Sequence, residues 1–180
     1  MNGLFCYMNL YSRVELLFRM DYGMRYSKAL DFVKAEYRKN IDTVGAGLVN
    51  ELTGVADILE EMGYSIEYRL TAILRNLPRD TAARPDEILG YSSMDVLEAV
   101  QLLNKDMDCD MYKYINDVRN NMLAMPVKLA EHLYNLRCAI GKSKQEIDAV
   151  IEDSQKYYTK CAKDTKFYEP ILKALMKLKH

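Results

Sequence analysis

Two polar blocks interrupt the apolar pattern of this chain and carry the side chains best suited to chemistry. They are LTAILRNLPRDT (Leu70–Thr81) and VKLAEHLYNLR (Val127–Arg137), and their only histidine is His132. Carboxylate and amide oxygens suit hard cations such as Mg²⁺, whereas a guanidinium is charged at any accessible pH and cannot ligate a cation. Arg75, inside the first block, therefore favours an ion pair there over a metal site.

These blocks strongly resemble those of the short bacterial HD-domain phosphohydrolases, which are relatives of the hydrolase domain of RelA/SpoT-type alarmone enzymes. In that family the first block reads roughly A-hydrophobic-L-His-Asp-x-x-Glu-Asp-Thr, and the second reads Val-Lys-Leu-Ala-Asp-x-x-His-Asn. The resemblance covers about residues 26–158 and implies an all-α fold, a single HD-domain-like helical bundle. Further matching stretches are KALDFVKAEYR (Lys28–Arg38), Asp42 and Gly45 ahead of Asn50-Glu51, GYSSMDVLEAVQLLNK (Gly90–Lys105) and YKYINDVRNNMLAMPVK (Tyr112–Lys128).

The resemblance also implies a divalent metal, usually manganese, held by two histidines and two aspartates. Such a metal lowers the pKa of a bound water for attack on phosphorus. Carried over residue by residue, the four ligand positions hold Glu51, Arg75, Asn76 and Glu131. Because all four ligand types have changed, the resemblance implies a degenerate site with no metal cofactor.

The family's catalytic Glu-Asp pair, which follows the ligands of the first block, is retained only in part. The position of the family's catalytic Glu holds Arg79, while its Asp neighbour is retained as Asp80. We therefore assign no catalytic residue. If the pocket persists as a site for a guanine nucleotide, the resemblance implies contacts from Asp42, Lys128, Tyr134 and Asn135.

The altered ligand set leaves two arrangements open. In the first, the Arg75 guanidinium stands where the metal stood and pairs with Glu51 or Glu131. In the second, the oxygens of Glu51, Asn76, Asp80 and Glu131 form an Mg or Mn site and Arg75 swings outward. Carboxylates that flank an arginine usually pair with it, so we expect the first arrangement.

Other chemical signals are weak. The run Asp106-Met-Asp108-Cys-Asp110 imitates the start of a calcium loop, but Met111 replaces the required Gly and Asp117 stands where Glu is needed. The four cysteines lie far apart without a CxxC pair, which suggests neither zinc nor disulfides. Residues 155–180 carry seven lysines against two acids. We interpret them as a solvated face, with RNA or an acidic partner as the less favoured alternative.

The elements that must position these blocks are helices, because nearly every segment shows the 3.6-residue period and none alternates like a strand. We expect residues 1–25 to be a helical appendage and residues 26–180 to be the HD-domain-like domain. In the first half of the chain the predicted helices cover about 9–22, with an interruption at Gly23, then 27–38, 48–62 and 65–77, with an end or kink at Pro78. A short helix should follow from Pro85, then one capped by Ser92 and Asp95 and one that starts at Asp110. The last three should cover 126–141, the segment from the capping box of Ser143 and Glu146 to about 161, and a segment with Pro170 in its first turn.

Composition excludes several classes of protein. The chain has 180 residues, 49% of them hydrophobic, and a formal charge of −1, which fits a folded domain without a general field for nucleic acid. The longest uncharged run, Met1–Ser12, is too short to span a bilayer and lacks signal-peptide features. We therefore expect a cytoplasmic protein with neither nucleic-acid nor membrane partners.

Three functions remain open at this stage. The first is a degenerate HD-domain protein that senses a nucleotide or binds a protein. The second is a metal-dependent phosphohydrolase of guanosine tetraphosphate (ppGpp) or a related nucleotide. The third is a structural helical domain that forms a homodimer through its N-terminal helix.

Overall fold

The fold follows from the helical periodicity of the sequence. The computed structural model describes residues 10–40, 44–104 and 110–179, and the side chains of residues 21–39, 47–104 and 110–179. These parts of the chain contain helices and connecting turns and no strand, which confirms the all-α prediction. The helices are α1 (Leu10–Asn40), α2 (Val44–Glu61), α3 (Ile66–Leu74), α4 (Leu77–Asp80), α5 (Pro85–Leu89), α6 (Met94–Leu103), α7 (Met111–Arg119), α8 (Ala124–Cys138), α9 (Lys144–Asp153), the π-helical turn η1 (Ser154–Tyr158), α10 (Thr159–Ala162) and α11 (Tyr168–Leu178).

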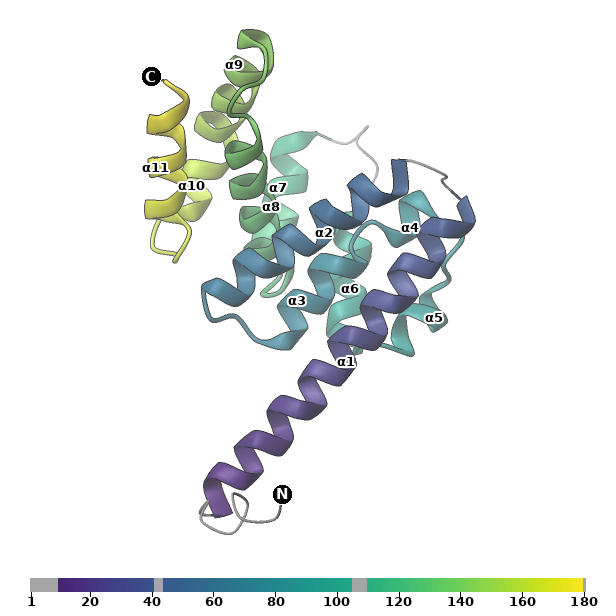
Figure 1. Ribbon diagram of the computed structural model, residues 1–180. Helices are drawn as coiled ribbons and strands as arrows, with labels where there is room; N and C mark the ends of the chain where they lie inside the picture. The colour runs from purple at the N-terminus through teal and green to yellow at the C-terminus, as the bar shows by residue number, and fades with distance from the viewer. Residues whose placement is uncertain (1–9, 41–43, 105–109, 180) are drawn as a thin grey trace.

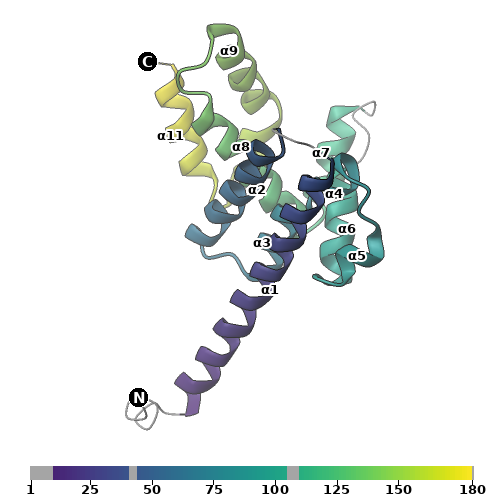
Figure 2. The ribbon, with the colours of Figure 1, turned by 45° about the vertical axis from the view of Figure 1, so that its right-hand side comes forward.

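Helix α3 is the centre of the bundle. It packs against α1, α2, α6 and α8, which surround it in Figures 1 and 2. Its side chains Leu70, Ile73 and Leu74 are fully buried, and burial of apolar surface is the main force that holds such a bundle together. The first polar block therefore begins in the middle of the core, and its second half, which contains α4, lies against α1.

Several predicted helix ends are confirmed. The Asp110 carboxylate accepts a hydrogen bond from the backbone N–H of Tyr112 and caps α7. Ser143 and Glu146 form the predicted capping box at the start of α9. Pro85 and Pro170 each lie in the first turn of a helix, where the missing N–H of proline costs nothing.

The predicted interruption at Gly23 is wrong. Helix α1 runs without a break from Leu10 to Asn40, and its first half extends away from the bundle (Figures 1 and 2). A single glycine inside a helix costs only about 1 kcal/mol, which the packing of Ala29, Val33 and Tyr37 against the core outweighs. The predicted domain boundary at residue 25 falls within this helix and stays a prediction.

Two other predicted boundaries need correction. Helix α2 begins at Val44, before the predicted start at residue 48, so Gly45 and Gly47 are helical. The N-cap of α6 is Ser93, one residue later than expected, because the hydroxyl of Ser92 donates instead to the carbonyl of Ile88.

Prolines near two helix starts also shift the expected bounds. Helix α3 ends at Leu74, and Pro78 lies in the first turn of the separate helix α4. Helix α8 begins two residues before Pro126, because the Asn121 side-chain oxygen accepts hydrogen bonds from the N–H groups of Leu123 and Ala124. Among the described residues, no helix is long and apolar enough to cross a membrane.

Candidate functional site

Three helices bring the two polar blocks together. Glu51 lies on α2, Arg75 is the C-cap residue of α3, and Glu131 lies on α8. Since α3 packs against both α2 and α8, residues that are 24 and 56 positions away from Arg75 meet it in space. The structure therefore brings together three of the four residues that the sequence assigned to ligand positions.

The guanidinium of Arg75 occupies the middle of this cluster. Arg75 is 1% exposed and is the largest fully buried side chain among the described residues. Its Nη2 donates to Oε1 of Glu51 at 2.7 Å, and its Nη1 donates to the carbonyl of Ala72 at 2.7 Å. Its Nε lies 3.9 Å from Oε2 of Glu131, too far for a hydrogen bond. The buried positive charge is thus held between two carboxylates.

Glu131 has a second cationic partner on its own helix. The Nζ of Lys128 donates to Oε2 of Glu131 at 3.2 Å, one turn away. Burial alone would raise the pKa of Glu131, but the charges of Lys128 and Arg75 outweigh it, so the pKa lies below its usual value. Burial alone would lower the pKa of Lys128, but the charge of Glu131 outweighs it and the pKa lies above its usual value. Both side chains are therefore charged at neutral pH.

Asp80 forms the third part of the cluster. Arg79 donates to it through Nε at 2.8 Å, and the hydroxyl of Tyr37 on α1 donates to its other oxygen at 2.9 Å. Burial and the bond to Asp80 raise the pKa of the Tyr37 phenol well above its usual value, so Tyr37 stays a donor. Each of the three carboxylates thus has a cation, and their formal charges cancel.

The remaining predicted residues are scattered around this cluster. Asn76 is half-buried, and its backbone carbonyl accepts from the N–H groups of Arg79 and Asp80. The Tyr134 ring lies against Gly54, where a Cβ atom would approach its Cε2 to 2.3 Å, so only glycine allows this contact. Asn135 is exposed, and Asp42 lies outside the described residues.

Sequence reasoning missed a buried aromatic pair behind the cluster. His132, 5% exposed, stacks on Tyr158 with ring centroids 4.1 Å apart. Burial lowers the pKa of His132 to about 4, and burial raises the pKa of Tyr158 to about 12. The π-helical turn η1 places Tyr158 there, and no sequence pattern announced that turn. The only feature of the sequence that could have indicated this pair is the position of His132 directly after Glu131.

Comparisons with known proteins agree with the helical topology. No family model matches the chain, and no curated protein matches it. A solved structure described as a metazoan orthologue of SpoT, which hydrolyses ppGpp and plays a role in starvation responses, superposes with a TM-score of 0.68. The match covers 85% of this chain and 94% of that chain at 18% sequence identity. The chain therefore has a SpoT-like, HD-domain-like fold with an extended N-terminal helix.

Proposed function

We propose that this chain is a non-hydrolytic protein of SpoT-like fold that works by binding, with a nucleotide or a protein as its ligand. The observation that carries the proposal is the position of the buried Arg75 guanidinium, hydrogen-bonded to Glu51 and adjacent to Glu131. The resemblance in sequence predicts that all three residues stand at metal-ligand positions of the HD-domain family. In this proposal the Arg75 guanidinium takes the place of the metal ion.

The side chains present do not fit a divalent metal. A dication about 4 Å from the Arg75 charge would be opposed by roughly 8 kcal/mol at an effective dielectric constant of about 20. The carboxylates that could offset this cost are already paired with Arg75, Lys128 and Arg79. Among the described residues, no three His, Cys, Asp or Glu side chains are grouped closely enough to hold a metal ion. No catalytic step follows from this arrangement.

A nucleotide is one of the two ligand classes in this proposal. Its support is the fold shared with a protein that acts on ppGpp, together with half-buried Tyr134 and exposed Asn135 beside the cluster. Tyrosine rings can stack on bases, and an amide can hydrogen-bond a base edge. The cancelled charges of the cluster provide no strong attraction for several phosphates, which favours a sensing role over tight binding.

A metal-dependent phosphohydrolase is the second candidate. It is favoured by the activity of the solved neighbour and by the carboxylates of Glu51 and Glu131 on either side of Arg75. It requires Arg75 to leave its buried position and break its bonds to Glu51 and Ala72. Breaking a buried ion pair costs about 3–5 kcal/mol, so metal binding would have to supply at least this free energy.

Thermal unfolding with guanine and adenine nucleotides, each with and without Mn²⁺, separates these functions. A ligand that binds only the folded state raises the Tm. We expect a guanine nucleotide to raise the Tm equally with and without Mn²⁺ if the site senses nucleotides. A rise that needs Mn²⁺ would favour the hydrolase, and no rise with any nucleotide would favour a protein partner.

A further inference from the structure

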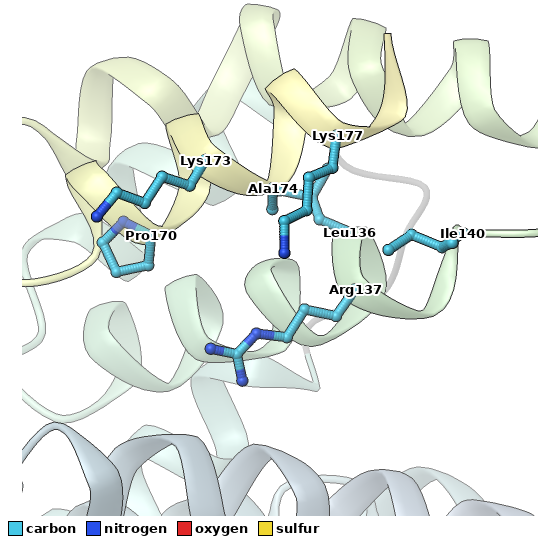
Figure 3. A pocket seen from close by; sticks show the side chains of 7 residues that line it. All are labelled: Leu136, Arg137, Ile140, Pro170, Lys173, Ala174 and Lys177. Carbon is cyan, nitrogen blue, oxygen red and sulfur yellow. The ribbon is translucent and has the colours of Figure 1, made fainter. Parts of the chain in front are cut away.

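A groove on the other side of α8 lies outside the Arg75 cluster. It runs between the end of α8 and the face of α11, has a volume of about 340 Å³, and shares no residue with the cluster. Figure 3 shows Lys177 extending from α11 toward α8, where Arg137 lies along the helix, with Lys173 and Pro170 at one end of the groove and Ile140 at the other. Leu136 and Ala174 complete its lining.

The groove combines an apolar floor with a cationic rim. Leu136 is fully buried at its base, while Ile140 at one end of the groove is 61% exposed. Its rim carries the positive charges of Arg137, Lys173 and Lys177, and no acidic side chain lines it. This lining offers apolar contact and positive charge at the same place.

The rim charges are largely unused within the protein. Neither Lys173 nor Lys177 forms an ion pair with another residue in the described parts of the chain. Arg137 lies 3.9 Å from Glu61, but both side chains are about half exposed or more, and such pairs contribute little. Lys177 and Arg137 lie in the last turns of their helices, where a cation is favourable, but this does not account for Lys173 in the middle of α11 or for exposed Ile140.

We propose that this groove binds an acidic segment of a partner protein. An apolar side chain of the segment would lie on Leu136 and Ala174 against Ile140. Flanking Asp or Glu side chains would meet Arg137, Lys173 and Lys177. The proposal does not rest on the function of the Arg75 cluster, because the two sites lie on different sides of α8 and have no residue in common.

The lining favours a peptide over other anions. A phosphate site usually has converging backbone N–H groups or a buried cation, whereas these cations are on exposed, flexible side chains. RNA binding needs an extended basic surface, and the protein as a whole carries a charge of −1. A membrane suits a convex amphipathic face, whereas this site is concave and accepts a protruding side chain.

The test is a selection of random peptides displayed on phage, with the full chain as bait. The affinity of the enriched peptides is then measured for the double variant Lys173→Glu/Lys177→Glu, whose substitutions are on exposed positions and leave the core intact. The matched control is Lys28→Glu/Lys113→Glu, which makes the same charge change at exposed positions on α1 and α7. Ile140→Ser tests the apolar wall without adding charge.

We expect enriched peptides to carry an apolar residue flanked by Asp or Glu. Their affinity should fall roughly tenfold or more in the double charge reversal and several-fold in Ile140→Ser, and remain unchanged in the matched control. Raising the salt concentration should weaken binding. The proposal is overturned if no peptide is enriched, if enriched peptides bind the double variant equally, or if poly(U) RNA or phosphatidylserine vesicles bind the groove while acidic peptides do not.

Discussion

The Nη2 atom of Arg75 donates a 2.7 Å hydrogen bond to Oε1 of Glu51, across 24 positions of sequence and between two helices. The resemblance in sequence predicts that both residues stand at metal-ligand positions of the HD-domain family. A buried arginine needs a carboxylate, and two carboxylates at close range need a cation. The Arg75 guanidinium therefore supplies the cation for Glu51 and Glu131 at the junction of α2, α3 and α8.

Removing the guanidinium should destabilise the protein strongly. Arg75→Ala leaves Glu51 and Glu131 in a partly buried site without their common cation, and we expect the free energy of unfolding to fall by about 3–5 kcal/mol in urea titrations. The matched control is Arg84→Ala, because Arg84 pairs with Asp86 at 2.9 Å while both side chains are about two-thirds exposed. It should leave the unfolding midpoint nearly unchanged.

A neutral replacement of the whole cluster should recover stability. In Glu51→Gln/Arg75→Met/Glu131→Gln no charge of this triad remains, and buried ion pairs can often be exchanged for neutral groups of similar volume at little cost. We expect this variant to unfold close to the wild type. If Arg75→Ala lowers the free energy of unfolding no more than Arg84→Ala does, the prediction for Arg75 is wrong.

The buried imidazole should make stability depend on pH above the range of the carboxyl groups. Burial lowers the pKa of His132 to about 4, whereas an unfolded chain has a histidine pKa near 6.5. Between these values the unfolded state binds a proton that the folded state does not, so stability is complete above about pH 6.5 and falls as the pH drops. The loss approaches about 1.4 kcal/mol per pH unit.

His132→Gln should flatten this slope in urea titrations between about pH 6.5 and pH 5, where unfolded carboxyl groups remain ionised. His180→Gln changes the other of the two histidines and serves as the control. Equal slopes in the wild type and in His132→Gln would show that His132 titrates normally in the folded protein. At lower pH, Glu131 should add a further loss, because its pKa in the folded state is depressed.

The first half of α1 should mediate self-association. The sequence places Leu10, Val14, Leu17 and Phe18 on one side of this segment, and its backbone extends away from the bundle (Figure 2). We expect light scattering to show a dimer for the full chain and a monomer after deletion of residues 1–22. A monomer in both cases would contradict this prediction.

Restoring the metal site should require all of its parts together. The five changes are Glu51→His, Arg75→His, Asn76→Asp, Arg79→Glu and Glu131→Asp. Single reversions should not bind Mn²⁺, because ligands act as a unit and the remaining cations still oppose the ion. Isothermal titration with Mn²⁺ should show binding for the quintuple variant alone. Equal binding by any single reversion would contradict the assignment of these positions.

Local signals in the sequence were sufficient for much of the fold. The caps at Asp110 and Ser143 and the prolines at 85 and 170 act within one helical turn, so their effect could be predicted from neighbouring residues alone. The error at Gly23 arose because its weak helix propensity competes with packing of the same helix further along. The N-cap of α6 is Ser93 and not Ser92, because the Ser92 hydroxyl already donates a hydrogen bond to the carbonyl of Ile88 at the end of α5. This contact between two helix ends could not be predicted from neighbouring residues alone.

The site also has one part that the sequence predicted and another that depends on helix packing. The resemblance placed Glu51, Arg75 and Glu131 in one cluster, and the structure brings these residues together. The second cation of Glu131, the phenol of Tyr37 on Asp80 and the stacking of His132 on Tyr158 depend on how α1, α8 and η1 pack. The groove of α8 and α11 was visible only as an excess of lysine in residues 155–180.

The most direct test of the central claim is the metal content of the purified wild-type protein, measured together with its turnover of ppGpp. Because the buried Arg75 guanidinium lies between Glu51 and Glu131, we predict no stoichiometric manganese or magnesium and no release of pyrophosphate from ppGpp, with or without added Mn²⁺. One bound metal ion per chain, or hydrolysis of ppGpp that disappears with a chelator, would contradict the account and establish the hydrolase in its place.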